Sequence, residues 1–280
     1  MAGQTLISTE ELGALLASSR PLHLVDASMC PGEDCKAKYQ ECHIPGAVFF
    51  DQEFIRNKNS AHSLGLLSAG AFADHMKALN LPNDGSLVVV YDQYSLISAA
   101  RVWFLLRYYS YQQVRYLDGG LPKWTQERRP VESGVTAVPG EEADPALYQL
   151  STKPEMLVHV EEVKAVVAEI QAGASGRQIW DPRNPAKVTS TVIPGSTCCF
   201  YREVLNHDGT FKSASEMQAV LSRTGLDFSR PIVTSCNRGV VSSAGYLILH
   251  LCGKTDVRNY HGSWIDWKVK VVDADPAPAT

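Results

Sequence analysis

The chain repeats itself, because four short patterns of its first half return in the same order in its second half. The separation between matched residues falls in steps from 155 to 149, 144 and 143 positions. The matched residues are Asp26 with Asp181, Pro45 with Pro194, Asp92 with Cys236, and Gly119 with Gly262. Such a slow drift is typical of a duplicated domain that has undergone small deletions. The 280 residues therefore predict two domains of similar build, each long enough to bury its own core.

Within each half, short β-rich runs alternate with amphipathic stretches. Leu87–Tyr91 and Ile232–Ser235 are apolar or β-branched throughout, as in strands that are buried on both faces of a parallel sheet. Each run leads into a helical pattern, Ser98–Arg107 in the first half and Ser242–Leu251 in the second. Gly253 is expected to follow the end of the second helix. This alternation predicts an α/β fold with helices on both faces of each sheet.

The composition places a linker between the two copies. Residues 129–154 are rich in Pro, Gly, Glu and Ala and exceed the length of an ordinary loop. We expect an N-terminal domain over residues 1–128, this linker, a C-terminal domain over residues 155–272 and a tail over residues 273–280.

Composition and charge exclude several classes of protein. Apolar residues make up 45% and charged residues 20% of the chain, and its formal net charge is −4, which favours neither a nucleic-acid nor an anionic-membrane partner. No apolar stretch approaches the ~18 residues that a bilayer requires. The first residues resemble neither a secretory signal nor an Arg-rich transit peptide. We expect an intracellular protein, cytoplasmic rather than mitochondrial.

The seven cysteines are too few and too irregular for a disulfide scaffold. We expect most of them to be free thiols in a reducing compartment. Cys30, Cys35, Cys42 and His43 lie close together in the sequence, but their spacing does not match the paired pattern of a zinc site. The sequence therefore predicts no metal and no cofactor.

Cys236 is the strongest candidate for chemistry, because it lies where an apolar strand runs into a helix. The backbone N–H groups of such a turn bind anions and favour the thiolate, which is the nucleophilic form of cysteine. Arg238 adds a positive charge, and Gly239 allows the backbone to fold closely around the sulfur. We predict that Cys236 is the nucleophile and that Asn237, Arg238, Gly239, Val240 and Val241 form the substrate-binding loop.

The first copy lacks these features. Asp92 lies opposite Cys236, and Gln93–Ile97 lie opposite the Asn-Arg-Gly-Val-Val loop. With no thiol, no cation and no glycine in this loop, we expect the first domain to be inactive and to have a structural role.

Five segments spread over nearly the whole chain form one further pattern. They are Glu41–Asp51, Ala100–Phe104, Leu117–Leu121, the Cys236-x-x-Gly-Val loop and Asp256–Trp264. Together they resemble the two-domain rhodanese family, which comprises thiosulfate and 3-mercaptopyruvate sulfurtransferases. The resemblance implies two tandem rhodanese-like domains, each a mostly parallel sheet with helices on both faces. It also implies that only the second domain carries the catalytic cysteine.

The resemblance further implies a reaction. The Cys236 thiolate takes the outer sulfur of a small anionic donor as a persulfide, and cyanide, a small thiol or a protein thiol then accepts it. In the family, two cations of the second domain face the donor, and the matching residues here are Arg183 and Lys187. A guanidinium can grip an oxyanion with two N–H groups, whereas Lys187 supplies a point charge. We expect Arg183 to act as the anion clamp.

Several residues depart from the family's pattern. Arg238 occupies the position at which mercaptopyruvate enzymes carry a Ser, and Glu53 and Leu64 stand where they carry Asp and His; His62 is two residues away. Thr191-Val192 replaces a Gly-His pair, and His261 replaces an Asp. The basic loop makes thiosulfate the favoured donor. A sulfur carrier or regulatory protein with little turnover is the alternative. A phosphatase is not expected, because Ser242 stands where its Cys-x₅-Arg loop needs Arg.

Overall fold

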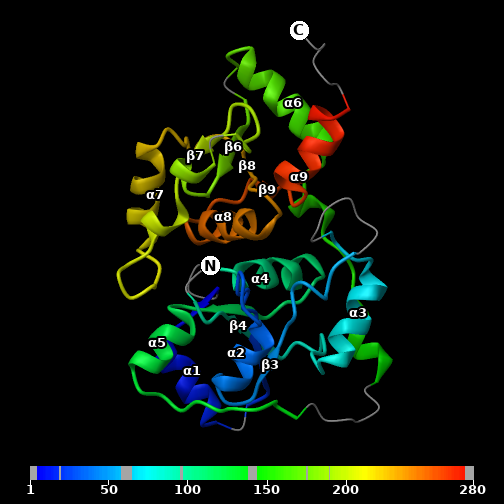
Figure 1. The fold of residues 1–280 in the computed structure, drawn as a ribbon, viewed down its shortest axis with the longest axis vertical. Coiled ribbons are helices and arrows are strands. Elements are labelled where there is room, and N and C mark those ends of the chain that lie inside the picture. Colours follow the sequence, from blue (N-terminus) through cyan, green and yellow to red (C-terminus); the bar gives the residue numbers. More distant parts are fainter. Residues whose placement is uncertain are drawn as a thin grey trace. The chain divides into compact units, whose positions relative to one another are not determined.

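The computed structural model describes residues 5–18, 20–57, 65–94, 97–137, 144–174, 176–188 and 190–274. The chain divides into two compact units (Figure 1). The first unit consists of Met1–Arg56, Leu67–Lys153 and Asn206–Phe211, and the second of Asn57–Leu66, Pro154–Leu205 and Lys212–Thr280.

A five-stranded parallel sheet in the order β1-β5-β4-β2-β3 forms the centre of the first unit. Its strands are β1 (Leu6–Ile7), β2 (Leu22–Asp26), β3 (Ala47–Phe49), β4 (Leu87–Tyr91) and β5 (Val114–Leu117). The apolar run predicted as a strand is β4, and its pairing with both β2 and β5 confirms that it is central.

Helices cover both faces of this sheet, as the unbroken apolar run of β4 requires. They are α1 (Thr9–Leu16), α2 (Cys35–Glu41), α3 (Ala69–Ala78), α4 (Ala99–Tyr108) and α5 (Gly120–Gln126), and the 3₁₀ turn η2 spans Pro145–Tyr148. Val89 and Tyr91 pack in one core with residues of α1, α2 and α5. Figure 1 shows α4 on the other side of the strands, the side that the alternating Val88 and Val90 face.

The second unit repeats this plan with a four-stranded parallel sheet in the order β7-β6-β8-β9. Its strands are β6 (Gln178–Asp181), β7 (Thr197–Cys198), β8 (Ile232–Thr234) and β9 (Val257–Asn259). Its helices are α6 (Val160–Gln171), α7 (Ala214–Arg223), α8 (Val240–Leu251) and α9 (Ser263–Trp267), with short 3₁₀ turns at Pro154–Met156, Pro185–Lys187 (η4) and Tyr201–Val204 and a π-helical turn at Lys268–Val272. Val163, Val233 and Trp267 join α6, β8 and α9 in one core. The expected α/β fold with helices on both faces is confirmed.

The predicted boundary of the second helix was wrong by two residues. The helix begins at Val240 rather than Ser242, because Gly239 takes a left-handed conformation with φ 90° and caps it directly. Val240 and Val241 are therefore helical. The other end agrees with expectation, since Gly253 follows the helix with φ 80° and its N–H donates to His250 O at 3.0 Å.

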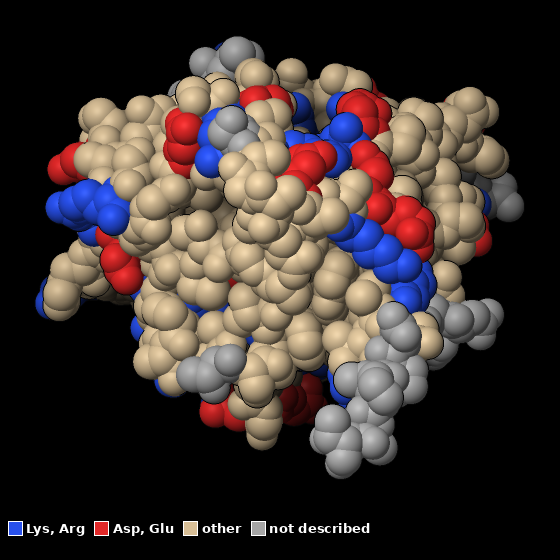
Figure 2. Space-filling view, turned by 90° about the horizontal axis from the view of Figure 1, so that it is seen from above, with Lys and Arg blue, Asp and Glu red and all other residues tan. Residues whose placement is uncertain are grey.

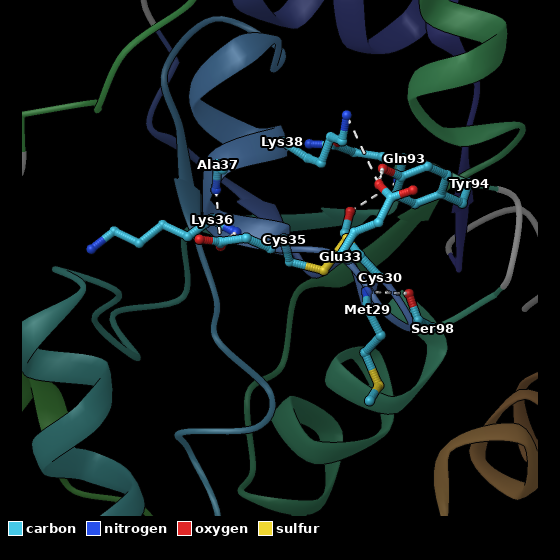
Figure 3. Close-up of a disulfide and its surroundings, with 12 residues drawn as sticks. Met29, Cys30, Glu33, Cys35, Lys36, Ala37, Lys38, Gln93, Tyr94 and Ser98 are labelled. Carbon is cyan, nitrogen blue, oxygen red and sulfur yellow. Dashed lines mark hydrogen bonds and ion pairs between the residues drawn. A yellow bond between two sulfur atoms is a disulfide. The ribbon is translucent and has the colours of Figure 1, made fainter.

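Two cysteines are not free thiols, although free thiols were expected for most of the seven. Cys30 and Cys35 form a disulfide in the connection between β2 and α2, with their Cα atoms 5.3 Å apart (Figure 3). Cys42, Cys198, Cys199, Cys236 and Cys252 are free. The sequence spacing did not reveal the pair, because the connection must turn back on itself to bring the two residues together; the turn is closed by a bond from Glu33 N–H to Cys30 O.

The surface carries both signs of charge. Figure 2 shows Lys and Arg side chains interspersed with Asp and Glu on the face that it presents. Among the residues that the structure describes, no helix has the length and apolar character needed to cross a membrane.

Within the first unit, Asp118 binds the segment of residues 206–211. Its carboxylate, which follows β5, accepts the Phe211 N–H at 2.9 Å, and the Phe211 ring meets Tyr116 edge-on at 5.8 Å. Burial raises the pKa of Asp118 to about 6, and the charge of Asp208 adds to this, although the Phe211 N–H and Lys123 act against it. Lys123 pairs with Asp208 at 2.9 Å.

The raised pKa of Asp118 predicts that the free energy of unfolding depends on pH. In the unfolded chain Asp has a pKa of about 4, so the folded protein binds more protons between about pH 4 and 6. The stabilising contribution of Asp118 is therefore present below about pH 4 and is lost as the pH rises through about 6. The free energy of unfolding of the wild type, minus that of Asp118→Asn, should be about 1–2 kcal/mol larger at pH 4.5 than at pH 7, after allowance for partial exposure.

Urea denaturation at the two pH values measures this difference. Asp227→Asn is the control, because hydrogen bonds from Ser229 lower the pKa of Asp227 and Asp227 is not among the groups that act on Asp118, so its contribution should change little between pH 4.5 and 7. An equal offset at both pH values for Asp118→Asn would contradict the assignment.

Candidate active site

Cys236 lies two residues beyond β8 and four before the start of α8, in the predicted strand-to-helix turn. Its side chain is 2% exposed. The Gly239 N–H donates to Cys236 Sγ at 3.2 Å, so the loop closes around the sulfur. Because the sulfur lies at the N-terminal end of a twelve-residue helix, the helix dipole favours a negative charge on it.

Gly239 is required by its surroundings. A Cβ atom at this position would lie 2.5 Å from His261 O and 3.1 Å from the His261 ring, and the φ of 90° disfavours any side chain. The expected role of Gly239 was to let the backbone fold closely around the sulfur. The atom that leaves no room for a side chain is the backbone carbonyl oxygen of His261, in the β9–α9 connection.

Ser263 holds the cysteine from the other side, and sequence reasoning missed it. Its Oγ accepts the Cys236 N–H at 3.0 Å, lies 3.6 Å from Cys236 Sγ and donates to Tyr260 O at 2.9 Å. Ser263 has φ 55°, which is unfavourable for a side chain. The matched residue Gly120 has φ 57°. The sequence signal for the role of Ser263 was its replacement of the matched Gly120, at a position where the backbone is left-handed.

A buried polar chain fixes the start of α8. Ser243 Oγ donates to Gly239 O at 2.7 Å, Asn259 Nδ2 donates to Ser243 Oγ at 3.1 Å, and Thr234 Oγ1 donates to Asn259 Oδ1 at 3.4 Å. The backbone contributes as well, because Trp264 N–H donates to Cys236 O at 3.1 Å. The loop is thus held to β8, β9 and α9 before any substrate binds.

Arg183 follows β6 and turns back onto the end of that strand. Its Nε and Nη2 hold the Asp181 carboxylate at 2.9 Å and 2.6 Å, and Nη2 and Nη1 also donate to Thr191 O and Oγ1 at 2.6 Å and 3.3 Å. The planar fork is therefore filled by Asp181. Among the described residues, one N–H of Nη1 is left without a partner.

The guanidinium of Arg183 nevertheless lies within electrostatic range of the cysteine. Burial works against the guanidinium charge, but the hydrogen bond to Asp181 and the charges of Asp181 and Cys236 raise the pKa of Arg183. Arg183 and Cys236 are therefore close enough to interact electrostatically within the second unit.

The other predicted site residues are placed as follows. Asn237, Arg238, Val240 and Val241 are half-buried around the cysteine, and Asn237 O accepts the Ile265 N–H at 3.2 Å. Lys187 ends η4 and is exposed; in the part of the chain that the structure describes, its side chain forms no hydrogen bond or ion pair. The structure brings the loop residues together but shows no contact between them and Lys187.

The first unit contains the same arrangement without the thiol. The Leu121 N–H donates to Asp92 O at 3.0 Å, as Trp264 does to the carbonyl of Cys236. Here the Asp92 carboxylate itself accepts the N–H of Ala99, the first residue of α4, at 3.1 Å. The positive end of this helix is thus occupied by a carboxylate of the chain.

Residues considered for other roles lie elsewhere. Glu53 is exposed in the first unit, and His62 and Leu64 lie outside the described residues. Ser242 is the third residue of α8 and is buried. No group of three or more His, Cys, Asp or Glu in the described residues could hold a metal. In the cluster considered for zinc, Cys30 and Cys35 are bonded to each other, and His43 Nδ1 is bonded to Tyr39 O.

A family model for the rhodanese-like domain matches residues 8–127 and again residues 162–270. The chain belongs to the rhodanese family. A 3-mercaptopyruvate sulfurtransferase of Rattus norvegicus is 34% identical over 280 residues, covering 95% of this chain and 93% of that protein. A thiosulfate sulfurtransferase of Bos taurus is 33% identical over 278 residues, covering 94% and 92%.

Solved structures agree with this membership. The crystal structure of SseA from Escherichia coli, a 3-mercaptopyruvate enzyme of rhodanese fold, superposes with a TM-score of 0.82 at 28% identity and covers 92% of this chain and 98% of that one. The Tum1 protein of Saccharomyces cerevisiae gives a TM-score of 0.84 at 25% identity, with 96% of each chain covered. The expected tandem rhodanese domains are confirmed, and the chain is a sulfurtransferase.

Gly239→Ala should disable this rhodanese loop. The added Cβ meets a backbone oxygen, so the loop must shift, and a displacement of about 1 Å at a reacting atom can lower a rate about 100-fold. Sulfur transfer from thiosulfate to cyanide measures the loss.

Gly253→Ala is the matched control for this variant. Gly253 has a similar φ of 80° at the other end of α8, but no atom lies within 4 Å of its added Cβ. Backbone strain should cost about 1–2 kcal/mol there while activity persists. Equal activity of the two variants would contradict the role assigned to the clash at Gly239.

Two substitutions of Ser263 separate its hydrogen bond from its strain. Ser263→Ala leaves the buried Cys236 N–H without its acceptor, which should lower the free energy of unfolding by about 1–3 kcal/mol. Ser263→Gly loses the same bond but relieves the left-handed strain, so it should be about 1 kcal/mol more stable than the alanine variant. Chemical denaturation of both variants tests this order; an alanine variant as stable as the wild type would refute it.

Proposed function

We propose that Cys236 carries the transferred sulfur as a persulfide. The observation that carries this proposal is the Gly239 N–H directed at Cys236 Sγ at 3.2 Å, at the positive end of α8. A thiolate and a persulfide are both anions, so the same N–H groups and helix end stabilise the enzyme before and after it takes up sulfur.

The reaction is a double displacement. The Cys236 thiolate attacks the outer sulfur of the donor, forming a new S–S bond, while the donor's own bond to that sulfur breaks and its electron pair leaves with sulfite or pyruvate enolate. A thiolate or cyanide acceptor then attacks the outer sulfur, and Cys236 leaves again as a thiolate. No oxidant or cofactor takes part.

The charges around the loop favour thiosulfate over 3-mercaptopyruvate as donor. Arg238 lies in the loop itself, and Arg183 is close enough to Cys236 for their charges to interact. Since its fork holds Asp181 and its charge compensates that carboxylate, Arg183 offers the donor the remaining N–H of Nη1 and no two-point grip. Lys187, which is exposed, supplies at most a distant charge that solvent screens.

Loading with sulfur tests the proposal. The purified protein is incubated separately with thiosulfate and with 3-mercaptopyruvate and then weighed intact by mass spectrometry. We expect the gain of one sulfur atom, larger with thiosulfate, and none in Cys236→Ser. Addition of cyanide should restore the original mass.

Cys252→Ser is the matched control, because Cys252 lies next to the other end of α8 and burial raises the pKa of its thiol to about 12. This variant should load as the wild type does. A gain of sulfur that persists in Cys236→Ser, or no gain with either donor, would refute the persulfide. Loading without release to cyanide or thiols would identify a sulfur carrier with little turnover.

A further inference from the structure

The disulfide of the first unit lies in an accessible loop. Cys30 and Cys35 are half-buried, and the four residues between them are all exposed. Figure 3 shows the sulfur–sulfur bond in the connection that leads from β2 into α2. A thiol in solution can therefore approach the bond without unfolding the sheet beneath it.

The fold gains less from this bond than from one that closes a long loop. The entropy that a disulfide removes from the unfolded chain grows with the length of the closed loop, and this loop holds only four residues between its cysteines. Other bonds already shape the segment: Glu33 N–H donates to Cys30 O at 3.0 Å, and the Asp34 carboxylate caps α2 by accepting the N–H groups of Lys36 and Ala37 at 2.9 and 3.1 Å.

The same bonds keep the two cysteines together when the disulfide is reduced. The turn from Cys30 to Glu33 and the cap at Asp34 do not depend on the sulfur atoms. The reduced thiols are thus held near the geometry of the disulfide, whose Cα separation of 5.3 Å lies in the usual range. Such a pair can open and close repeatedly without refolding.

The loop is also attached to the β4–α4 connection, the counterpart of the Cys236 loop. Met29 N–H, next to Cys30, donates to Ser98 Oγ at 3.2 Å, and Tyr94 OH donates to Glu33 Oε2 at 3.3 Å (Figure 3). A change at the disulfide therefore reaches Tyr94 and Ser98 through one hydrogen bond each.

We propose that Cys30 and Cys35 form a thiol–disulfide exchange site for dithiols, separate from the sulfur-transfer site. A thiolate of the dithiol attacks one cysteine sulfur, forming a mixed disulfide while the other cysteine leaves as a thiolate and takes up the proton released by the dithiol. The second thiol of the reagent then attacks the mixed disulfide and releases the remaining cysteine. The dithiol is oxidised to a disulfide, and Cys30 and Cys35 become two thiols. This inference does not depend on the persulfide at Cys236.

A redox titration of the full chain tests the site. The native protein is equilibrated with mixtures of reduced and oxidised dithiothreitol, its thiols are trapped with iodoacetamide, and the peptide that carries both cysteines is analysed by mass spectrometry. Cys30 and Cys35 should be alkylated together, as one two-electron couple, and should return to the disulfide when the ratio is reversed. A bond that resists reduction until the chain is denatured, or that does not re-form, would overturn the proposal.

Hydrogen exchange gives a second readout. Reduction should leave amide exchange in residues 29–36 within about twofold of that in the oxidised protein, because the turn at Cys30 and the cap at Asp34 do not depend on the sulfur atoms. Cys30→Ser should show the same slow exchange without reductant. Cys42→Ser, which alters a free thiol just after α2, should titrate and exchange as the wild type does. Much faster exchange of residues 29–36 after reduction would show that the disulfide, and not the backbone bonds, holds the two cysteines together, and would overturn the proposal.

Discussion

Both halves of this chain depend on one interaction, in which a side chain just beyond a strand accepts an N–H from the start of the following helix. In the second half the group is the sulfur of Cys236, which receives the Gly239 N–H at 3.2 Å. In the first half it is the carboxylate of Asp92, which receives the Ala99 N–H at 3.1 Å. Each lies just past a strand that is paired on both sides within its sheet, so strand order and helix position together create the site.

The ends of the neighbouring strands, β2 in the first half and β6 in the second, differ in charge. Arg183 and Ser28 occupy matched positions, and each donates its backbone N–H to the aspartate two residues earlier, at 3.1 and 3.0 Å. Only Arg183 adds a cation, which neutralises Asp181. Among the residues that the structure describes, Asp26 has no such partner, and burial raises its pKa despite hydrogen bonds from Ser28 and Gln93. At this strand end of the second half, the charge of the carboxylate is thus already compensated, which favours the approach of an anionic donor.

The sequence was sufficient to predict the features that depend on local pattern. The apolar run of β4, the strand-to-helix turn at Cys236 and the glycine after it follow from residue type and period. Features that depend on long-range geometry were not predictable in this way. Ser263 matters because a left-handed backbone 27 residues away directs its hydroxyl at the Cys236 N–H.

Two further features show the same limit. The fork of Arg183 points at Asp181 and Thr191 because the chain after β6 returns to that strand end, and no property of the residue type reveals this. The disulfide depends on a turn in which Glu33 donates to Cys30. Spacing in the sequence shows which groups are near one another, but only the path of the backbone decides which of them meet.

The position of the helix after each central strand has an evolutionary consequence. Helix α8 begins four residues after Cys236, whereas α4 begins seven residues after Asp92. The side chain of Asp92 receives its N–H from Ala99, seven residues further on, whereas Cys236 receives one from Gly239, only three residues further on. The two copies thus differ in the path of the backbone after the strand as well as in their side chains. A cysteine placed at position 92 would therefore not by itself reproduce the loop that surrounds Cys236.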